Sequence, residues 1–391
     1  MGQETMELDI DVTKFLREQR QKSPAELHPY FDEFVDLYER KLWHQLTLKY
    51  LQFITLPASK PLQIQMFKSF IADWVKKMNK LHLVTIALSA ARQFQDYNEA
   101  IQFLESLTKD LNDPESQDSY VHATMETAYF RLLLGDLDRT KLAMNECGKI
   151  LDRFDSVDPA VHASYYRVCA DYYKARAEYA QYYKHALLYL ASVNVEELSL
   201  AEQVERAYDI SIAALMADTI YNFGELLMHP ILDTLKDTPH DWLRKLLFAF
   251  NSGDIGKFEA IAPQFATNQP LLQANLTFLR QKICLMSLIE AVFTRGSENR
   301  SMAFSQIAQE TRLPIDEVEH LVMKALSLGL LRAKIDQVAG VVRVSWVQPR
   351  VLSRPQIEGM ARRLKEWNEG VKETASFVEQ EGAEIFAGVH H

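Results

Sequence analysis

A pattern that returns about every forty residues is the feature that most limits how this chain can fold. In each copy an apolar helical segment is followed by an acidic residue and then by a second helical segment. The acidic residues are Asp96, Asp136, Glu178, Asp218 and Asp254, at intervals of 40, 42, 40 and 36 residues. A near-constant period of this length is typical of stacked antiparallel helix pairs, because each pair leaves an apolar face that the next pair covers. The pattern predicts an α-solenoid before residue 290; chance likeness among ordinary helix hairpins is the alternative.

Composition narrows the class of protein. Glycine makes up 13 of 391 residues, below the usual share of about 7%, which favours helices over glycine-rich phosphate loops. A net charge of −10 and a pI near 5.6 oppose attraction of the whole chain to nucleic acid or anionic membranes. Cys147, Cys169 and Cys284 form no CxxC pair, as expected for reduced thiols. Without a signal-peptide or membrane-spanning pattern, we expect a soluble protein of the cytoplasm and nucleus.

The segment after this helical region has the element order of a winged helix. The expected elements are a helix at 281–293, a short strand at 302–304, helices at 306–311 and 315–328, and strands at 331–336 and 341–346. Gly329 is placed to end the second helix of the pair with a left-handed residue. The predicted buried stripe of that helix consists of Ile315, Val318, Val322, Ala325 and Leu328. In the last strand a period of two places Val342, Val344 and Trp346 on the buried face.

A winged helix often reads DNA, and that possibility can be weighed from charge. The end of the second helix that would enter the major groove carries Asp316, Glu317 and Glu319. These carboxylates would face phosphates of like charge, and that end has no Arg, Asn or Gln for base contacts. The cations Arg332, Lys334 and Arg343 follow on the strands, where a solvated strand face explains them. Nucleic-acid binding is therefore the weaker alternative.

The C-terminal region predicts one long helix with a regular apolar stripe, here called the seam. Its positions are Ile357, Met360, Leu364, Trp367, Val371, Thr374 and Val378. Their spacing alternates between three and four residues, which is the a/d pattern of a coiled coil with one polar position, Thr374. We expect the seam to pack on helices of other chains, with Trp367 as a large central anchor. Folding back onto its own domain is the alternative.

Motifs for catalysis are missing from the sequence. There is no HxH, HExxH or zinc-like Cys/His spacing, and no GxGxxG, Walker or GxSxG motif. We therefore expect no catalytic residues, no cofactor, no metal site and no small-molecule substrate.

Helical repeats that run into a winged helix resemble the PCI family, whose members are subunits of the proteasome lid, the signalosome and a translation initiation factor complex. The longer motifs resemble the proteasome-lid branch over nearly the whole chain. These motifs are KLWHQLTL at 41–48, YNFGELLMHP at 221–230, FAFNSGD at 248–254, LRQKICLMSLIEAVF at 279–293, EHLVMKALSLGLL at 319–331 and WVQPRVL at 346–352.

The resemblance implies a mainly α fold with three domains. These are N-terminal helical repeats at 1–168, a PCI domain at 169–352 and a C-terminal bundle helix at 353–391. Within the PCI domain we expect a helical part at 169–293 and a winged helix at 294–352.

The resemblance also implies a non-catalytic scaffold that supports lid assembly and ubiquitin-dependent protein degradation, with a subunit of a related PCI complex as the alternative. The expected partners are other PCI subunits, deubiquitinase-type subunits and the ubiquitin-receptor subunit, with no nucleic acid and no membrane. The expected contact sites are the seam without Thr374 and a winged-helix edge strand formed by Val341, Val342, Arg343, Val344, Ser345 and Trp346.

Overall fold

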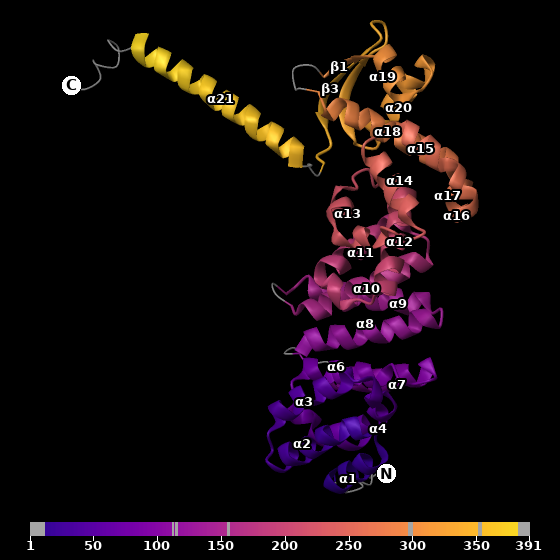
Figure 1. Cartoon of the computed structure of the whole chain (residues 1–391), viewed down its shortest axis with the longest axis vertical. Helices are drawn as coiled ribbons and strands as arrows, with labels where there is room; N and C mark the ends of the chain where they lie inside the picture. Colours follow the sequence, from indigo (N-terminus) through magenta and orange to yellow (C-terminus); the bar gives the residue numbers. More distant parts are fainter. Residues whose placement is uncertain are drawn as a thin grey trace, which may run out of the picture. The chain divides into compact units, whose positions relative to one another are not determined.

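The computed structural model describes residues 12–381 except 112, 114–115, 155–156, 296–299 and 351–353. The chain divides into two compact units between Ser199 and Leu200. Both units are mainly helical, and a small sheet follows the helices of the second unit, as Figure 1 shows. The predicted fold class, helical repeats followed by a winged helix and a C-terminal helix, is confirmed.

The first unit is built from short helices in sequence order. They are α1 (Val12–Lys22), η1 (Ala25–Leu27), α2 (His28–Glu39), α3 (Trp43–Thr55), η2 (Pro57–Leu62), α4 (Gln63–Met66), η3 (Phe67–Ile71), α5 (Ala72–Trp74), η4 (Val75–Lys77), α6 (Lys80–Ala91), α7 (Tyr97–Asp110), α8 (Gln117–Leu133), α9 (Leu137–Leu151), α10 (Pro159–Ala175), α11 (Tyr179–Ser192) and η6 (Val195–Glu197). From α6 onward each helix packs against its sequence neighbours, and α8 also contacts α10, so this part stacks as a solenoid.

The second unit contains a helical part, the winged helix and the C-terminal helix. Its elements are α12 (Leu200–Met216), α13 (Gly224–Met228), η7 (Pro230–Leu235), α14 (Asp241–Asn251), α15 (Ile255–Ile261), η8 (Ala262–Gln264), α16 (Phe265–Asn268), α17 (Pro270–Ala274), α18 (Leu276–Phe293), β1 (Ser301–Ala303), α19 (Phe304–Thr311), α20 (Ile315–Ser327), β2 (Leu331–Asp336), β3 (Val341–Val347) and α21 (Arg354–Glu381).

The tight helix hairpins share one turn. In the connection from α8 to α9, Gly135 has a φ of 83°, and its amide donates to the carbonyl of Leu132 at 2.9 Å. The next amide, of Asp136, donates to the carbonyl of Arg131 at 3.0 Å. This pair of bonds is a Schellman motif, which satisfies the last carbonyls of the first helix. The same turn lies at Lys41, Ala177 and Gly253 in other hairpins, and at Gly329 after α20.

The repeating acids begin the second helix of most hairpins. Asp96, Asp136 and Asp254 are N-cap residues whose carboxylates accept backbone amide hydrogens at 2.9, 3.1 and 3.0 Å. Glu178 occupies the same position before α11 without a side-chain capping hydrogen bond. Asp218 instead lies in the connection between α12 and α13, six residues before α13 begins. The forty-residue signal is therefore a signal of helix starts, and it fails where a longer connection replaces the tight turn.

The winged helix has an antiparallel sheet of three strands in the order β1-β3-β2. This order corrects one expectation, because the segment Val341–Val344 is central and not an edge. Its residues pair with Ser301–Ala303 on one side and with β2 on the other, and the amide of Val344 donates to the carbonyl of Arg300 at 2.9 Å. β3 is the last strand in the sequence, but it lies between β1 and β2 in the sheet. Among the described residues the free edges therefore belong to β1 and β2.

A β-bulge corrects a second expectation in the same strand. The pairing shifts between Arg332 and Ala333, which face Trp346 and Val344, so Ser345 is the extra residue. An extra residue reverses the alternation of the side chains beyond it. Trp346, expected to be buried, is consequently 36% exposed, and Val347 is buried in its place.

The predicted stripe of α20 is confirmed at Val318, Val322 and Ala325, which are buried. Ile315, in the first turn, is 56% exposed, Leu328 is half-buried, and Leu321 is buried in addition.

A buried lysine connects α18 to the end of α12. The ammonium of Lys282 donates to the carbonyls of Ala214, Leu215 and Ala217 at 2.8, 3.1 and 2.6 Å. Burial lowers the pKa of Lys282 to about 7, and the three acceptors offset part of that penalty. The side chain thus satisfies C-terminal carbonyls that the end of a helix leaves unpaired.

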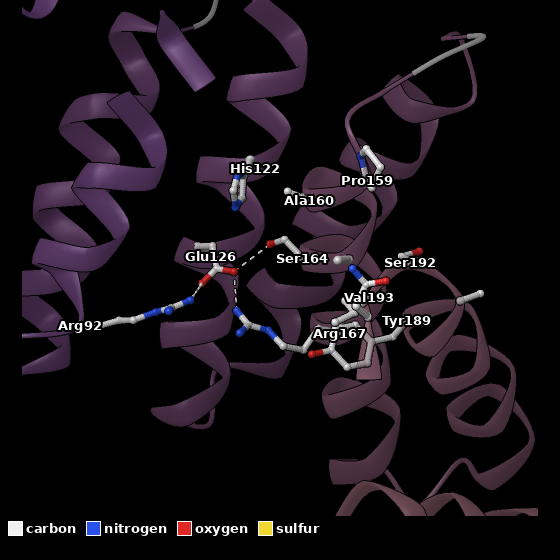
Figure 2. Close-up of a pocket in the computed structure, with 13 residues that line it drawn as sticks. Arg92, His122, Glu126, Pro159, Ala160, Ser164, Arg167, Tyr189, Ser192 and Val193 are labelled. Carbon is white, nitrogen blue, oxygen red and sulfur yellow. Dashed lines mark hydrogen bonds and ion pairs between the residues drawn. The ribbon is translucent and has the colours of Figure 1, made fainter. Parts of the chain in front are cut away.

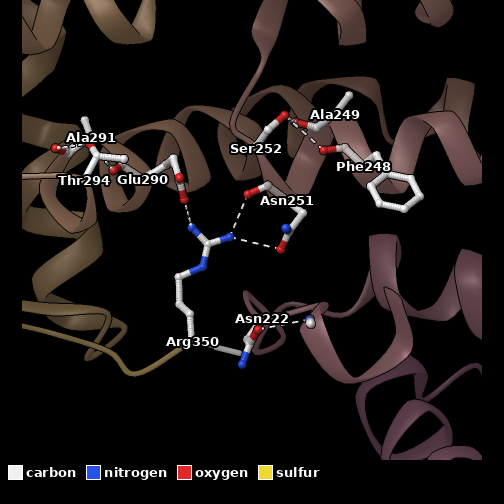
Figure 3. A network of polar contacts seen from close by, with 10 residues as sticks. Asn222, Phe248, Ala249, Asn251, Ser252, Glu290, Ala291, Thr294 and Arg350 are labelled. Carbon is white, nitrogen blue, oxygen red and sulfur yellow. Dashed lines mark hydrogen bonds and ion pairs between the residues drawn. The ribbon is translucent and has the colours of Figure 1, made fainter. Parts of the chain in front are cut away.

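A buried arginine fixes the chain just before the C-terminal helix. Figure 3 shows the guanidinium of Arg350 between Glu290 of α18 and Asn251 at the end of α14. Nη2 donates to the backbone and side-chain oxygens of Asn251 at 2.6 and 3.0 Å, and Nη1 pairs with the Glu290 carboxylate. The side chain of Arg350 is only 6% exposed. The segment after β3 is therefore held to two helices of its own unit.

Gly253→Ala is expected to destabilise the second unit more than Gly329→Ala. Both glycines have a positive φ, 64° and 68°, so both alanines incur a left-handed strain of about 1–2 kcal/mol. A Cβ at Gly253 would also lie 2.5 Å from the Cα of Ser287, whereas one at Gly329 meets nothing within 4 Å. In Gly253→Ala, relieving this clash by displacing α18 adds roughly 1–3 kcal/mol to the loss of stability. Urea denaturation followed by circular dichroism measures both losses, and equal losses would contradict this packing.

Arg350→Ala is expected to lower the free energy of unfolding by roughly 2–4 kcal/mol, because it leaves Glu290 and Asn251 without their partner. Arg343→Ala is the matched control. Its side chain is 68% exposed and lies 3.7 Å from Asp336, so its loss should change the stability by less than about 0.5 kcal/mol. Thermal and urea unfolding of the two variants check the difference, and a similar small effect of both would refute the anchoring role.

Candidate interaction surfaces

The C-terminal helix α21 presents an apolar surface that is exposed in the described part of the chain. Its seam residues are all exposed: Ile357 by 53%, Met360 by 43%, Leu364 by 61%, Trp367 by 70%, Val371 by 46% and Val378 by 49%. The polar seam position, Thr374, donates its hydroxyl hydrogen to the carbonyl of Gly370 at 2.8 Å and so needs no outside partner. A contiguous exposed strip of this kind is a candidate interaction site.

The borders of the seam add to its apolar character. The flanking e positions are Ala361, Asn368 and Ala375, and the g positions are Arg363, Gly370 and Phe377. Phe377, which lies outside the seam, is 62% exposed. Only Arg363 carries a charge, so these positions lack the complementary pairs that usually specify a two-helix coiled coil. Small flanks instead allow helices to approach from more than one side, which suits a bundle.

The outer face of the winged-helix sheet is the second exposed surface. Of the six predicted contact residues, Arg343, Ser345 and Trp346 are exposed, Val341 is half-buried, and Val342 and Val344 pack into the core. The guanidinium of Arg332 lies 5.1 Å from the centre of the Trp346 ring, a cation–π distance. The bulge thus creates an exposed aromatic and cationic patch, Trp346 with Arg332, although the alternating pattern predicts Trp346 to be buried. Large aromatic and Arg side chains are enriched in protein interfaces.

The helix that would read DNA has an acidic start, as expected. Asp316 and Glu317 lie in the first turn of α20, and the Glu319 carboxylate accepts from Gln337 at 3.0 Å. One of the strand cations, Arg343, lies within ion-pair distance of Asp336. The charge on this face is therefore mixed, and it offers little to a phosphate backbone.

No group of three or more His, Cys, Asp or Glu residues in the described part of the chain is arranged to hold a metal ion. Likewise, none of the helices in this part is both long and apolar enough to cross a membrane.

Comparisons with known proteins cover the chain almost from end to end. Three family models match in order: PSD13 N-terminal repeats at residues 30–247, the PCI domain at 262–346 and the Rpn9 C-terminal helix at 350–382.

Full-length relatives agree with these models. The chain is 40% identical over 380 residues to the probable 26S proteasome regulatory subunit rpn9 of Schizosaccharomyces pombe, with 97% of this chain and 99% of that protein covered. It is 40% identical over 370 residues to 26S proteasome non-ATPase regulatory subunit 13 homolog A of Arabidopsis thaliana, covering 93% and 96% of the two chains. It is 37% identical over 389 residues to the 26S proteasome regulatory subunit RPN9 of Saccharomyces cerevisiae, covering 96% and 98%. The chain therefore belongs to the Rpn9 family of PCI-domain 26S proteasome regulatory subunits, also named non-ATPase subunit 13.

Proposed function

We propose that this chain is a structural subunit of the 26S proteasome regulatory-particle lid that supports lid assembly and ubiquitin-dependent protein degradation. The observation that carries the proposal is the exposed seam of α21 in a chain whose relatives are named as proteasome subunits along their full length. A solvent-exposed strip of large apolar side chains gains free energy only when other helices cover it.

The proposed partners are other PCI subunits, deubiquitinase-type subunits and the ubiquitin-receptor subunit of the lid. In this proposal the chain performs no catalysis and works in the cytoplasm and nucleus. Its domains are 1–168, 169–352 and 353–391, which remain predicted boundaries. A role in the signalosome or an initiation factor complex is less favoured, because relatives about 40% identical over nearly the whole chain are named as proteasome subunits.

The winged helix provides the second proposed contact. The free edge of β2 (Leu331–Asp336) has unpaired backbone groups among the described residues, and such an edge can extend a sheet into a neighbour. Arg343, Ser345 and Trp346 lie on the exposed face next to that edge and would contact the neighbour through their side chains. In this proposal Val341, Val342 and Val344 hold the strand in place through their buried or half-buried side chains.

Leu364→Glu is expected to reduce incorporation into the lid by roughly tenfold or more, because the new carboxylate would be buried without a partner. Ser376→Glu is the matched control, since it adds the same charge to the same helix at a position away from the seam. Quantitative mass spectrometry of lid subunits that co-purify with each tagged variant measures incorporation. Equal recovery of lid subunits with both variants would count against the seam.

Truncation after Leu352 is expected to leave a folded chain that no longer enters the lid. The core residues of the winged helix, such as Val322 and Val347, all precede that point. Circular dichroism checks that the helical signal per residue persists, and native gel electrophoresis of proteasomes checks incorporation. Normal incorporation of the truncated chain would defeat the proposal for α21.

A further inference from the structure

A cavity of about 630 Å³ lies in the first unit. Its walls come from α8, α10, the end of α6, the last turn of α11 and the residues that follow α11. The volume lies within the range of about 300–1,000 Å³ that is usual for ligand sites. It is therefore large enough to hold more than one side chain of a bound peptide.

A buried carboxylate organises the charged side of the cavity. Glu126 is 3% exposed, and its Oε1 accepts from the hydroxyl of Ser164 at 2.8 Å and from Nη2 of Arg167. Figure 2 shows Arg92 approaching the same carboxylate from the side opposite Arg167. Burial opposes ionisation of Glu126, but the charges of Arg167 and Arg92 outweigh it and hold the pKa of Glu126 below its ordinary value. Glu126 is therefore a fixed anion at neutral pH.

Two cations in the wall of the cavity, Arg92 and Arg167, share the carboxylate of Glu126. Arg167 makes the direct bond to Glu126, whereas Nη2 of Arg92 lies 3.6 Å from Oε2, beyond hydrogen-bond distance. Arg92 is 56% exposed, so its guanidinium is oriented by the ion pair and still open to a ligand. Two carboxylates outside the cavity wall also act on this site, Asp171 on Arg167 and Asp158 on His122. Asp158 caps α10 by accepting from the amide of Ala160 at 2.8 Å.

A histidine supplies a further unused group. His122 lines the cavity and is 8% exposed, and its Nδ1 has no hydrogen-bond partner. Burial, the main influence on its pKa, lowers that pKa below the ordinary value. His122 is thus a neutral ring at neutral pH, able to donate or accept one bond. Unpaired buried polar groups are uncommon and point to an absent partner.

The apolar part of the wall decides what kind of anion fits. Ala160, Ala163 and Val193 line the cavity beside the charged groups. A small inorganic anion would leave this wall uncovered, but a peptide can place an apolar side chain there while its carboxylate meets Arg92. We infer that the cavity binds an acidic peptide segment of a partner protein, with Arg92 receiving an Asp or Glu carboxylate and an apolar neighbour filling the space beside it.

The test is binding of a fluorescein-labelled peptide of alternating glutamate and leucine to the full chain, followed by fluorescence anisotropy. We expect saturable binding that weakens roughly tenfold in Arg92→Gln, because the variant loses a charge-assisted contact. Arg40→Gln is the matched control. Arg40 is 66% exposed and pairs with Asp36 outside the cavity, so its replacement should leave binding unchanged. Thermal unfolding of both variants confirms that they fold.

Three further arms make the result decisive even if Arg92→Gln folds poorly. A peptide with glutamine in place of glutamate should bind the unaltered chain roughly tenfold more weakly. A peptide with lysine in that place should not bind, and inorganic phosphate at the concentration of the peptide should not displace it. Equal binding of the glutamate and glutamine peptides, preference for the lysine peptide, or displacement by phosphate would each overturn the inference.

Discussion

The turn that ends one helix and begins the next is the constraint on which the rest of the architecture depends. A left-handed residue closes the Schellman motif of the first helix, and the following residue is already the N-cap of the second. Because no loop residues separate the two helices, the end of the first helix lies at a fixed distance from the start of the second. The two helices must therefore pack along their length. Each pair then leaves an apolar face for the next one, which is how α8 comes to contact both α9 and α10.

Sequence reasoning could find the features that depend on local chemistry. The side chains of Asp96, Asp136 and Asp254 cap the first turns of their helices, so these residues mark helix starts. Gly329 marks a helix end, because glycine readily adopts a positive φ. The seam of α21 was equally legible, because a heptad is a property of one helix alone. That the seam binds other helices stays a prediction, whereas the helix that carries it is present in the structure.

Features that depend on pairing at a distance could not be found in the same way. The strand order places β3 in the centre of the sheet although it is the last strand in the sequence. The bulge at Ser345 moves the Trp346 side chain to the opposite face of the sheet. An alternating sequence does not show where the pairing with the partner strand shifts by one residue. The anchor of Arg350 and the cluster around Glu126 join residues 60 and 41 positions apart, respectively. Charged residues usually face solvent, so the burial of these groups has no local signal in the sequence.

The anchor of Arg350 also has a mechanical meaning. The residue lies between the sheet and α21 in the chain, and its guanidinium is fastened to Glu290 and Asn251. A pull on α21 would therefore load this ionic and hydrogen-bonded clamp before it could peel β3 from its neighbours. Strands that are peeled open one bond at a time yield to small forces, whereas a clamp of several simultaneous bonds yields only when all of them break together. Force exerted by partners on α21 would thus pass into the helices α14 and α18, while the sheet beside them kept its shape.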